Sequence, residues 1–419
     1  MTDGATGSVR DMVVVGASLA GLRAVESARR TGYDGRITLV GSEPHLPYDR
    51  PPLSKAYLDD AEPPSVLYRE REKLAELDVD LALGEPATAL DPERRVLRVG
   101  GRELPYDAAV LATGARARVL PGTEHLKGVH TLRTLDDAIA VREALDAGAR
   151  TVVIGAGFIG SEVASAARKR GLSATIVEAM PTPLVRSIGT EMGAALTGLH
   201  SAHGTEMRCG TSVDGLESTS PEGAGGTARV SGVRLVDGTV IPADLVVVGI
   251  GATPETGWLE SSGLSLDNGV VCDETLWTGF PGVYAAGDVV RWHNPLFGAA
   301  MRIEHWTCAA EQGAIAARNA LDPGAATPYE TVPYFWSDWY GCRIQFVGVP
   351  GGDQVEVVSG SVETGAFVAL YRTGDRLTGA LTVDRQSDVM KYRKQIAKRA
   401  SWSEALDFAR TREAAWAKA

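Results

Sequence analysis

The chain has 419 residues, more than one ordinary domain holds, and its 44% hydrophobic and 23% charged residues are typical of a globular protein in water. A formal net charge of −11 argues against a nucleic-acid binder, and no apolar run is long enough to predict a membrane span. The four cysteines stand far apart, in no CxxC or Cys/His pattern, so we expect no metal site, no redox dithiol and a reducing cytoplasmic setting.

The first part of the chain combines a strand, a glycine turn, a helix and a second strand. Residues 1–11 are polar, and we expect a short disordered arm there rather than a signal peptide. The apolar run Met12–Val15 predicts a buried strand that leads through the turn 16–21 (Gly-Ala-Ser-Leu-Ala-Gly) into a helix. A second buried strand, Ile37–Val40, ends near Glu43. This order is the βαβ context in which a glycine turn indicates a dinucleotide site.

The same layout recurs in the middle of the chain. Thr151–Ile154 predicts a strand, the turn 155–160 (Gly-Ala-Gly-Phe-Ile-Gly) follows it, and Ser161–Arg170 predicts a helix. The next strand, Ala174–Val177, ends at Glu178. Because the βαβ layout is repeated, we predict two Rossmann-like domains.

Three other apolar strands close on glycine. They are Asp107–Ala112 before Thr113 and Gly114, Leu245–Ile250 before Gly251, and Gly282–Ala286 before Gly287 and Asp288. After about Pro323 the aromatic cluster Tyr334–Tyr340 opens a region of alternating apolar and polar stretches, which predicts an antiparallel sheet followed by helices. Those stretches are Arg343–Val349, Gln354–Val358, Phe367–Tyr371 and Leu377–Val383.

We therefore predict an α/β fold with two Rossmann-like dinucleotide-binding domains and a C-terminal α+β domain. The first domain comprises residues 11–115 and 246–325, the second comprises residues 116–245, and the third comprises residues 326–419. In the third domain, Lys391–Arg399 holds five basic residues and no acid. A solvated helix face is the ordinary interpretation of such a segment, and docking of an acidic partner is the alternative.

The second glycine turn matches the full dinucleotide fingerprint. Gly155 permits a tight turn, Gly157 lets the backbone approach a pyrophosphate, and Gly160 allows close packing of helix and strand. The helix N-terminus supplies N–H donors and a favourable dipole for phosphate. Glu178 can accept both ribose hydroxyls and would repel a 2′-phosphate, which favours NADH over NADPH, although Arg186 nearby slightly weakens that preference.

The first glycine turn departs from this fingerprint, because Ser18 stands at the second glycine position. Its Cβ narrows the approach of a phosphate, although its hydroxyl can donate a hydrogen bond. Glu43 stands where a ribose acceptor belongs. Asp288, after a strand and a glycine, is placed to hold the ribityl chain of a flavin. These two acids favour FAD in the first domain.

Several segments together resemble the FAD-dependent ferredoxin reductases of bacterial oxygenase systems, of the putidaredoxin reductase and biphenyl-dioxygenase reductase type, within the pyridine nucleotide-disulfide oxidoreductase superfamily. These segments are residues 47–55 (Pro-Tyr-Asp-Arg-Pro-Pro-Leu-Ser-Lys), 111–114 (Leu-Ala-Thr-Gly), the second glycine turn continued to Glu162, 285–288 (Ala-Ala-Gly-Asp) and 302–306 (Arg-Ile-Glu-His-Trp). The resemblance extends over nearly the whole chain.

The resemblance implies contacts with two cofactors. Contacts with FAD are implied for Gly16, Ser18, Ala20, Gly21, Glu43, Arg50, Lys55, Ala87, Ala112, Thr113, Gly114, Arg133, Gly287, Asp288, Trp306 and Trp336. Contacts with NAD are implied for Gly155, Gly157, Phe158, Ile159, Gly160, Glu162, Glu178, Arg186 and Gly251. Lys55 would lie beside the isoalloxazine ring with Glu162 near it and the nicotinamide, so these two are the candidate catalytic residues. An ordinary surface ion pair for Lys55 and Glu162, and a plain core position for Trp336, are the alternatives.

The absence of paired cysteines narrows the function. Disulfide reductases of this fold place a redox CxxC or CxxxxC against the flavin, whereas Asp49–Lys55 contains no sulfur. Electrons must then leave the flavin directly, which indicates an FAD-dependent NAD(P)H:ferredoxin oxidoreductase. We expect it to pass electrons from NADH through FAD to a small iron–sulfur ferredoxin that serves a cytochrome P450 or a Rieske oxygenase. The alternatives are a rubredoxin reductase, a nitrite-reductase-type flavin module, and an apoptosis-inducing-factor-like FAD/NAD protein that controls partner binding.

Overall fold

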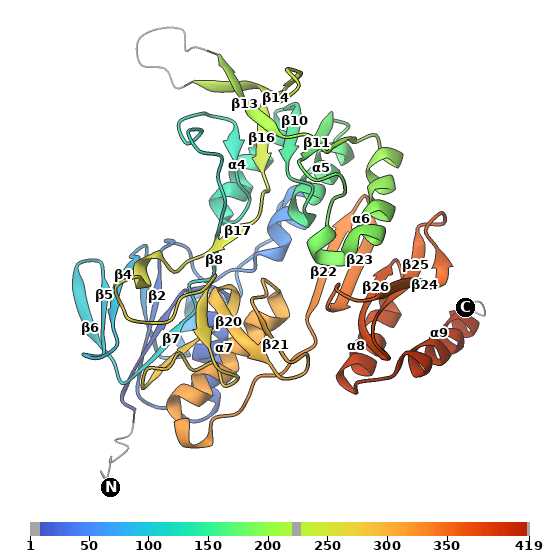
Figure 1. Ribbon diagram of the computed structural model, residues 1–419. Helices are drawn as coiled ribbons and strands as arrows, with labels where there is room; N and C mark the ends of the chain where they lie inside the picture. Colours follow the sequence, from blue (N-terminus) through green and yellow to red (C-terminus); the bar gives the residue numbers. More distant parts are fainter. Residues whose placement is uncertain (1–8, 220–227, 417–419) are drawn as a thin grey trace. The chain divides into compact units, whose positions relative to one another are not determined.

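The computed structural model describes residues 9–219 and 228–416, which form two compact units (Figure 1). Unit 1 comprises the described residues up to 49 together with 66–116 and 253–331. Unit 2 comprises residues 50–65 and the described residues of 117–252 and of 332 onward. Most of the arm predicted at residues 1–11 lies outside the described residues. The boundaries of the three predicted domains stay a prediction.

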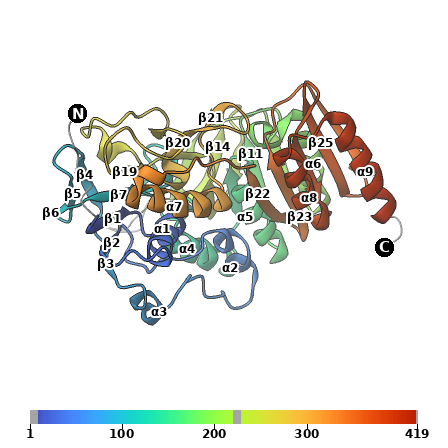
Figure 2. The same ribbon diagram turned by 90° about the horizontal axis from the view of Figure 1, so that it is seen from below.

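Unit 1 is built on a five-stranded parallel sheet with the strand order β19-β7-β1-β2-β3. In chain order the strands are β1 (Asp11–Val15), β2 (Arg36–Gly41), β3 (Val79–Leu83), β7 (Ala108–Leu111) and β19 (Val283–Ala285). The central strands are buried almost throughout, as expected for parallel strands covered on both faces. Helices α1 (Leu19–Arg30) and α7 (Trp306–Leu321) lie side by side against this sheet (Figure 2).

Shorter elements complete unit 1. One small antiparallel sheet consists of β4 (Ala87–Asp91), β5 (Val96–Val99) and β6 (Arg102–Pro105), and another small sheet consists of β18 (Val270–Cys272), β20 (Val290–Asn294) and β21 (Ala299–Met301). The helical turns are α3 (Arg71–Ala75), η2 (Gly257–Leu259), η3 (Gly287–Val289) and η4 (Pro323–Ala325). Strands β8 (Ala115–Ala117) and β17 (Ala252–Pro254) occupy the stretches where the chain passes from one unit to the other.

Unit 2 repeats the parallel layout with the strand order β12-β11-β10-β16-β9. Its strands are β9 (Val129–His130), β10 (Thr151–Ile154), β11 (Ala174–Glu178), β12 (Glu206–Cys209) and β16 (Leu245–Val248), and its helices are α4 (Leu135–Asp146), α5 (Phe158–Lys169) and α6 (Val185–Ala202). An antiparallel sheet of β13 (Val213–Thr219), β14 (Arg229–Leu235) and β15 (Val240–Pro242) packs onto this core. Residues 50–65 add η1 (Pro51–Ser54) and α2 (Ala56–Asp59).

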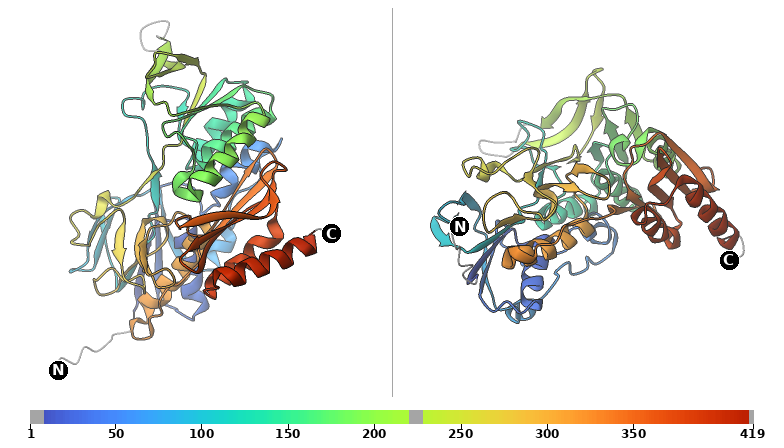
Figure 3. Two further views of the ribbon diagram at one scale, coloured as in Figure 1. Left: turned by 45° about the vertical axis from the view of Figure 1, so that its right-hand side comes forward. Right: turned by 60° about the horizontal axis from the view of Figure 1, so that its bottom comes forward.

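The C-terminal part of unit 2 is an antiparallel sheet with two helices against it (Figure 3). The strand order is β22-β23-β26-β25-β24, with β22 (Tyr334–Trp339), β23 (Cys342–Gly348), β24 (Gln354–Ser361), β25 (Ala366–Thr373) and β26 (Arg376–Val383), followed by α8 (Gln386–Ala397) and α9 (Trp402–Trp416). Helix α6 buries Ile188, Met192 and Leu196 against this sheet, in a core shared with Trp339 and Phe346.

The predicted fold class is confirmed: two Rossmann-like parallel sheets precede a C-terminal antiparallel sheet with helices. Several element boundaries differ from prediction by a few residues, and two of them lie at the second glycine turn. Helix α5 starts at Phe158 rather than Ser161, because Gly157 takes an extended backbone and acts as the N-cap. Strand β16 ends at Val248 rather than Ile250, because the Gly249 carbonyl turns toward Gly155.

The basic segment Lys391–Arg399 lies on α8 and the turn after it. Lys394, Lys398 and Arg399 are exposed, whereas the Arg393 side chain donates to the Val332 carbonyl. The segment is thus in part a solvated face and in part a structural contact. None of the helices in the described part of the chain combines the length and hydropathy needed to cross a bilayer.

A buried charge cluster joins the two C-terminal helices. Arg385 and Asp388 have fully buried side chains. Asp388 accepts from Arg385 at 3.4 Å and lies 2.6 Å from an Arg412 guanidinium nitrogen on α9. Arg385 also contacts Glu413 at 3.1 Å and stacks over the Trp416 ring at 3.9 Å. Loss of the central carboxylate would leave buried guanidinium charge without its main counter-ion.

We expect Asp388→Ala to destabilise unit 2 by about 3–5 kcal/mol, because removing one member of a buried ion pair strands the other. Urea or thermal unfolding of the full chain measures the loss. Asp407→Ala is the matched control, because Asp407 on α9 is 70% exposed and pairs with an exposed arginine. Its cost should stay near zero. Equal effects of the two changes would contradict the role given to the cluster.

Candidate active site

The first glycine turn in unit 1 has no room for side chains at its two glycines. Gly16 has φ +119°, and a Cβ there would lie 2.1 Å from the Ala112 carbonyl oxygen. A Cβ on Gly21 would lie 1.9 Å from the Gly16 carbonyl oxygen. Ser18 is the N-cap of α1 with an extended backbone that any residue adopts. Its departure from the fingerprint therefore brings no backbone strain.

The other predicted contacts of unit 1 follow neighbouring strands at the same edge of the sheet. The turn 16–21 follows β1, Ala112–Gly114 follows β7, and Gly287–Asp288 follows β19. Gly287 has φ +81°, and a Cβ there would lie 3.2 Å from the Ala20 Cβ. Because ligands of open α/β sheets bind outside the carboxyl ends of the strands, this edge is a suitable cradle for a dinucleotide.

Glu43 and Trp306 are both held by residues that sequence reasoning did not single out. The Tyr48 hydroxyl donates to Glu43 at 2.6 Å, just beyond the end of β2. The Trp306 indole N–H donates to Asp49 at 2.8 Å, and the Tyr68 hydroxyl donates to the same carboxylate oxygen. Burial raises the pKa of Tyr68 and Asp49 adds to that rise, so the phenol keeps its proton.

A buried amide also supports this edge of unit 1. The Gly287 N–H donates to the Gln312 side chain at 2.8 Å, and Gln312 is buried on α7. The Thr113 hydroxyl donates to the Glu255 carbonyl at 3.0 Å. Ala87, one of the predicted FAD contacts, is the first residue of β4 and packs against the main core. Gln312 was not singled out from the sequence, although a glutamine among the alanines of a buried helix face indicates a buried hydrogen bond.

The second glycine turn, in unit 2, has the same tight geometry. Gly155 has φ +100°, and a Cβ there would lie 2.4 Å from the Gly249 carbonyl oxygen. A Cβ on Gly160 would lie 2.6 Å from the Gly155 carbonyl oxygen. A Cβ placed on Gly157 would lie 3.8 Å from the nearest atom, the Gly249 carbonyl oxygen. This position therefore has open space for an approaching group. The residues therefore fit a pyrophosphate at the start of α5.

The carboxylate of Glu178 is oriented by the backbone. Its two oxygens accept the Ala156 and Met180 amides, each at 2.8 Å. Both oxygens retain acceptor capacity, as a ribose diol requires. Arg186 is exposed on the first turn of α6.

The remaining predicted NAD contacts also lie in unit 2. Ile159 is 45% exposed on the first turn of α5, and Phe158 packs against Phe335 and Trp339. Gly251 has φ +99° with no atom near a Cβ position, and its carbonyl accepts the Arg118 amide. An exposed Ile159 beside open glycine backbone suits the apolar parts of a nucleotide.

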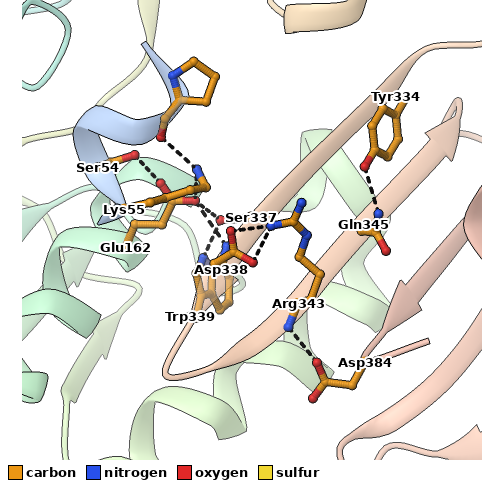
Figure 4. A network of polar contacts seen from close by, with 11 residues as sticks. Ser54, Lys55, Glu162, Tyr334, Ser337, Asp338, Trp339, Arg343, Gln345 and Asp384 are labelled. Atoms are coloured by element: carbon orange, nitrogen blue, oxygen red, sulfur yellow. Dashed lines mark hydrogen bonds and ion pairs between the residues drawn. The ribbon is translucent and has the colours of Figure 1, made fainter. Parts of the chain in front are cut away.

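The centre of the site in unit 2 is the carboxylate of Glu162 on α5 (Figure 4). Lys55 lies with its Nζ 2.8 Å from Oε1, and the Ser54 and Ser337 hydroxyls donate to Oε2 and Oε1. The Glu162 side chain is only 2% exposed and that of Lys55 18%, so this is not an ordinary surface ion pair. Ser337 was missed, although a serine between Phe335 and Trp339 on a buried strand face is a signal for it.

Three of the predicted FAD contacts, Arg50, Arg133 and Trp336, occupy defined places in unit 2. The Arg50 guanidinium donates to the Arg133 carbonyl at 2.5 Å, which brings these arginines together. Trp336 lies half-buried on β22, stacked on Tyr334 at 5.7 Å and under the Arg343 guanidinium at 5.6 Å. It is therefore no ordinary core residue.

All four cysteines are free thiols. Burial raises the pKa of Cys342 to about 11, with Asp384 adding to the rise, and burial also raises the pKa of Cys209 and Cys272. These thiols are poor nucleophiles at neutral pH, since the thiolate is the reactive form. The cysteines therefore do not form a redox dithiol that could carry electrons away from a flavin.

Known proteins resemble this chain in both sequence and fold. Residues 10–313 match the family described as pyridine nucleotide-disulphide oxidoreductase, and residues 334–410 match the family described as reductase C-terminal. The sequence is 39% identical over 389 residues to rhodocoxin reductase of Rhodococcus erythropolis, covering 92% of this chain and 89% of that protein.

Two further relatives extend the comparison. The ferredoxin–NAD(+) reductase component of the anthranilate 1,2-dioxygenase system of Burkholderia cepacia is 37% identical, with 93% of this chain and 95% of that protein covered. The crystal structure of the covalent putidaredoxin reductase–putidaredoxin complex matches with a TM-score of 0.87 and 36% identity, and 94% of each chain is covered.

One buried histidine beside this site gives a pH prediction. His200 contacts the Ser161 and Tyr340 hydroxyls, and burial lowers its pKa from 6.5 to about 4. The unfolded chain binds a proton there between about pH 6.5 and 4 while the folded chain does not. The stabilisation is thus present above pH 6.5 and is lost as the pH falls toward 4.

We expect His200→Asn to reduce the acid sensitivity of the chain by about 2 kcal/mol between pH 6.5 and 5. Urea unfolding at both pH values measures the difference. The exposed His293→Asn should keep the pH dependence of the unmodified chain. An unchanged slope in His200→Asn would contradict the assignment.

Proposed function

Because this chain belongs to the pyridine nucleotide-disulphide oxidoreductase family and carries its reductase C-terminal region, we propose that it is an NADH-dependent ferredoxin reductase. It passes electrons from NADH through FAD to a small iron–sulfur ferredoxin. The ferredoxin in turn serves a cytochrome P450 or a Rieske oxygenase, as befits relatives named for a dioxygenase system and for rhodocoxin. We place this activity in the cytoplasm.

The observation that carries this proposal is the duplicated glycine cradle, once in each unit. The backbones of Gly16 and Gly155 each lie in close contact with a carbonyl at the carboxyl edge of a parallel sheet. Such an edge with a helix N-terminus beside it holds a pyrophosphate. FAD, when bound, accepts a hydride from NADH and releases two electrons singly. We assign the glycine cradle of unit 1 to FAD and that of unit 2 to NADH.

Ribose recognition in both cradles rests on acids that the protein has oriented in advance. In unit 2 the Ala156 and Met180 amides hold Glu178 for the NADH diol, and the carboxylate disfavours the 2′-phosphate of NADPH. In unit 1 Tyr48 holds Glu43 for the adenosine ribose of FAD. Asp288 is assigned to the ribityl chain, and Arg50 and Arg133 to the phosphates.

Around the isoalloxazine we assign Lys55, Trp306 and Trp336. The Lys55 ammonium stabilises negative charge as it develops near the ring. Within its own unit each indole is fixed by its neighbours, Trp306 by Asp49 and Trp336 by Arg343. Since the chain has no reactive dithiol, electrons pass to an external one-electron acceptor.

The direct test is rapid mixing of the flavin-loaded chain with NADH, followed by addition of a [2Fe–2S] ferredoxin. We expect bleaching of the flavin spectrum and then stoichiometric reduction of the ferredoxin. A flavin that NADH does not reduce would sink the proposal. A panel with rubredoxin measures acceptor preference, and slow turnover with every carrier would favour an apoptosis-inducing-factor-like role.

The nucleotide preference is tested at Glu178. Glu178→Ala removes two charged hydrogen bonds to the ribose, so the ratio of kcat/KM for NADH over NADPH should fall about ten-fold or more. Steady-state reduction of ferricyanide with each nucleotide measures it. Glu206→Ala, which removes a carboxylate from the neighbouring strand β12, should leave the ratio unchanged. The assignment fails if both variants behave alike.

A further inference from the structure

Glu162 receives hydrogen bonds from three residues on two elements in addition to its contact with Lys55 (Figure 4). Ser54 at the end of η1 donates to Oε2, and Ser337 on β22 donates to Oε1. The Asp338 amide approaches Oε1 at 3.4 Å. Without Lys55, this buried carboxylate therefore keeps a donor on each of its oxygens. An isolated buried charge has no such support.

The direction of the Ser337 hydrogen bond is fixed by its neighbour. The Trp339 indole N–H donates to the Ser337 oxygen at 2.8 Å. An indole nitrogen can only donate, so the hydroxyl proton of Ser337 remains for Glu162. Every partner of Glu162 thus offers a proton, which is the pattern around an ionised carboxylate.

The position of Ser337 is itself secured by a strained turn. Tyr340 has φ +52°, an unfavourable backbone for a residue with a large side chain. Its amide donates to the Ser165 hydroxyl on α5 at 2.7 Å, and its own hydroxyl contacts His200 and Thr205 at 2.8 Å. The bond to Ser165 ties the β22–β23 hairpin to α5, the helix that carries Glu162, and the contacts of the Tyr340 hydroxyl tie the hairpin to the end of α6 and to Thr205.

Lys55 is held far less firmly than Glu162. Within residues 9–219 and 228–416, the ammonium otherwise contacts the Pro51 carbonyl at 3.5 Å, at the limit of a hydrogen bond. A lysine has a flexible four-carbon stem and three donors, whereas Glu162 is fixed from several sides. The pair is therefore asymmetric, with an anchored anion and a movable cation.

We propose that Ser54 and Ser337 are positioning residues that anchor Glu162 as a permanent anion, so that the Lys55 ammonium can turn from it toward negative charge developing at the cofactor. This inference rests on the proposed function for the identity of that cofactor. The serines replace the lysine as partners of the carboxylate, so the departure of Lys55 leaves no uncompensated buried charge. In this pair the carboxylate stays in place and the ammonium can change its partner, which a static salt bridge would not allow.

The first test is a double-mutant cycle on thermal unfolding of the full chain as purified. Lys55→Met should lower the melting midpoint only slightly when both serines are present, and at least about twice as much in Ser54→Ala/Ser337→Ala. If the combined variant does not fold, the same cycle with Ser337→Ala alone decides. An equal loss in both backgrounds would overturn the proposal, and this cycle needs neither NADH nor ferredoxin.

The second test is the two-electron midpoint potential of the bound flavin. Ser54→Ala/Ser337→Ala should lower the potential when Lys55 is present and leave it unchanged in a Lys55→Met background, because the serines act through the lysine. Ser337→Thr retains a hydroxyl and should retain the potential. Ser262→Ala, which removes a buried hydroxyl in unit 1, is the matched control.

The outcomes separate the inference from the proposed function. Equal shifts in both backgrounds, or no shift with Lys55 present, would overturn the positioning role. Coupling in the thermal cycle together with a flavin that NADH does not reduce would support the anchored carboxylate and refute the proposed function.

Discussion

The arrangement of both units depends on how closely two stretches of backbone approach each other at the carboxyl edge of a parallel sheet. At Gly16 and at Gly155 the chain leaves one strand, touches the carbonyl after the adjacent strand and enters a helix. A single Cβ would occupy space already filled by that carbonyl. The helix N-terminus can face the sheet edge only because this contact is made, and the positions of Glu43 and Glu178 follow from it.

The sequence could predict what is encoded locally. The glycine turns, the strands around them and the acid that ends the next strand lie within a few dozen residues of each other, so their spacing identifies them. The partners of Glu162 could not be found in this way, since Ser54 lies 108 residues away and Ser337 175. The same holds for Asp49 and Trp306, which lie 257 residues apart. Only the resemblance to a family indicated that Lys55 and Glu162 belong together, and it said nothing of the serines.

The C-terminal sheet contributes chemistry as well as packing to unit 2. One short strand, β22, places the half-buried Trp336 and the fully buried Ser337 on opposite sides, because successive residues of a strand face opposite ways. Phe158, the first residue of α5, packs on Phe335 of the same strand. Strand β22 therefore packs against the start of the nucleotide-binding helix and also carries Ser337, the partner of Glu162. A shift of this strand would move both contacts.

The interleaving of the two units also constrains how the chain matures on the ribosome. Strand β19 and helix α7 close the sheet and cover α1 in unit 1, yet they are synthesised after almost all of the parallel layer of unit 2. The apolar faces of β1, β7 and α1 must then wait, exposed, until residue 321 has left the exit tunnel. The emerging chain thus carries unprotected strand edges through most of its translation.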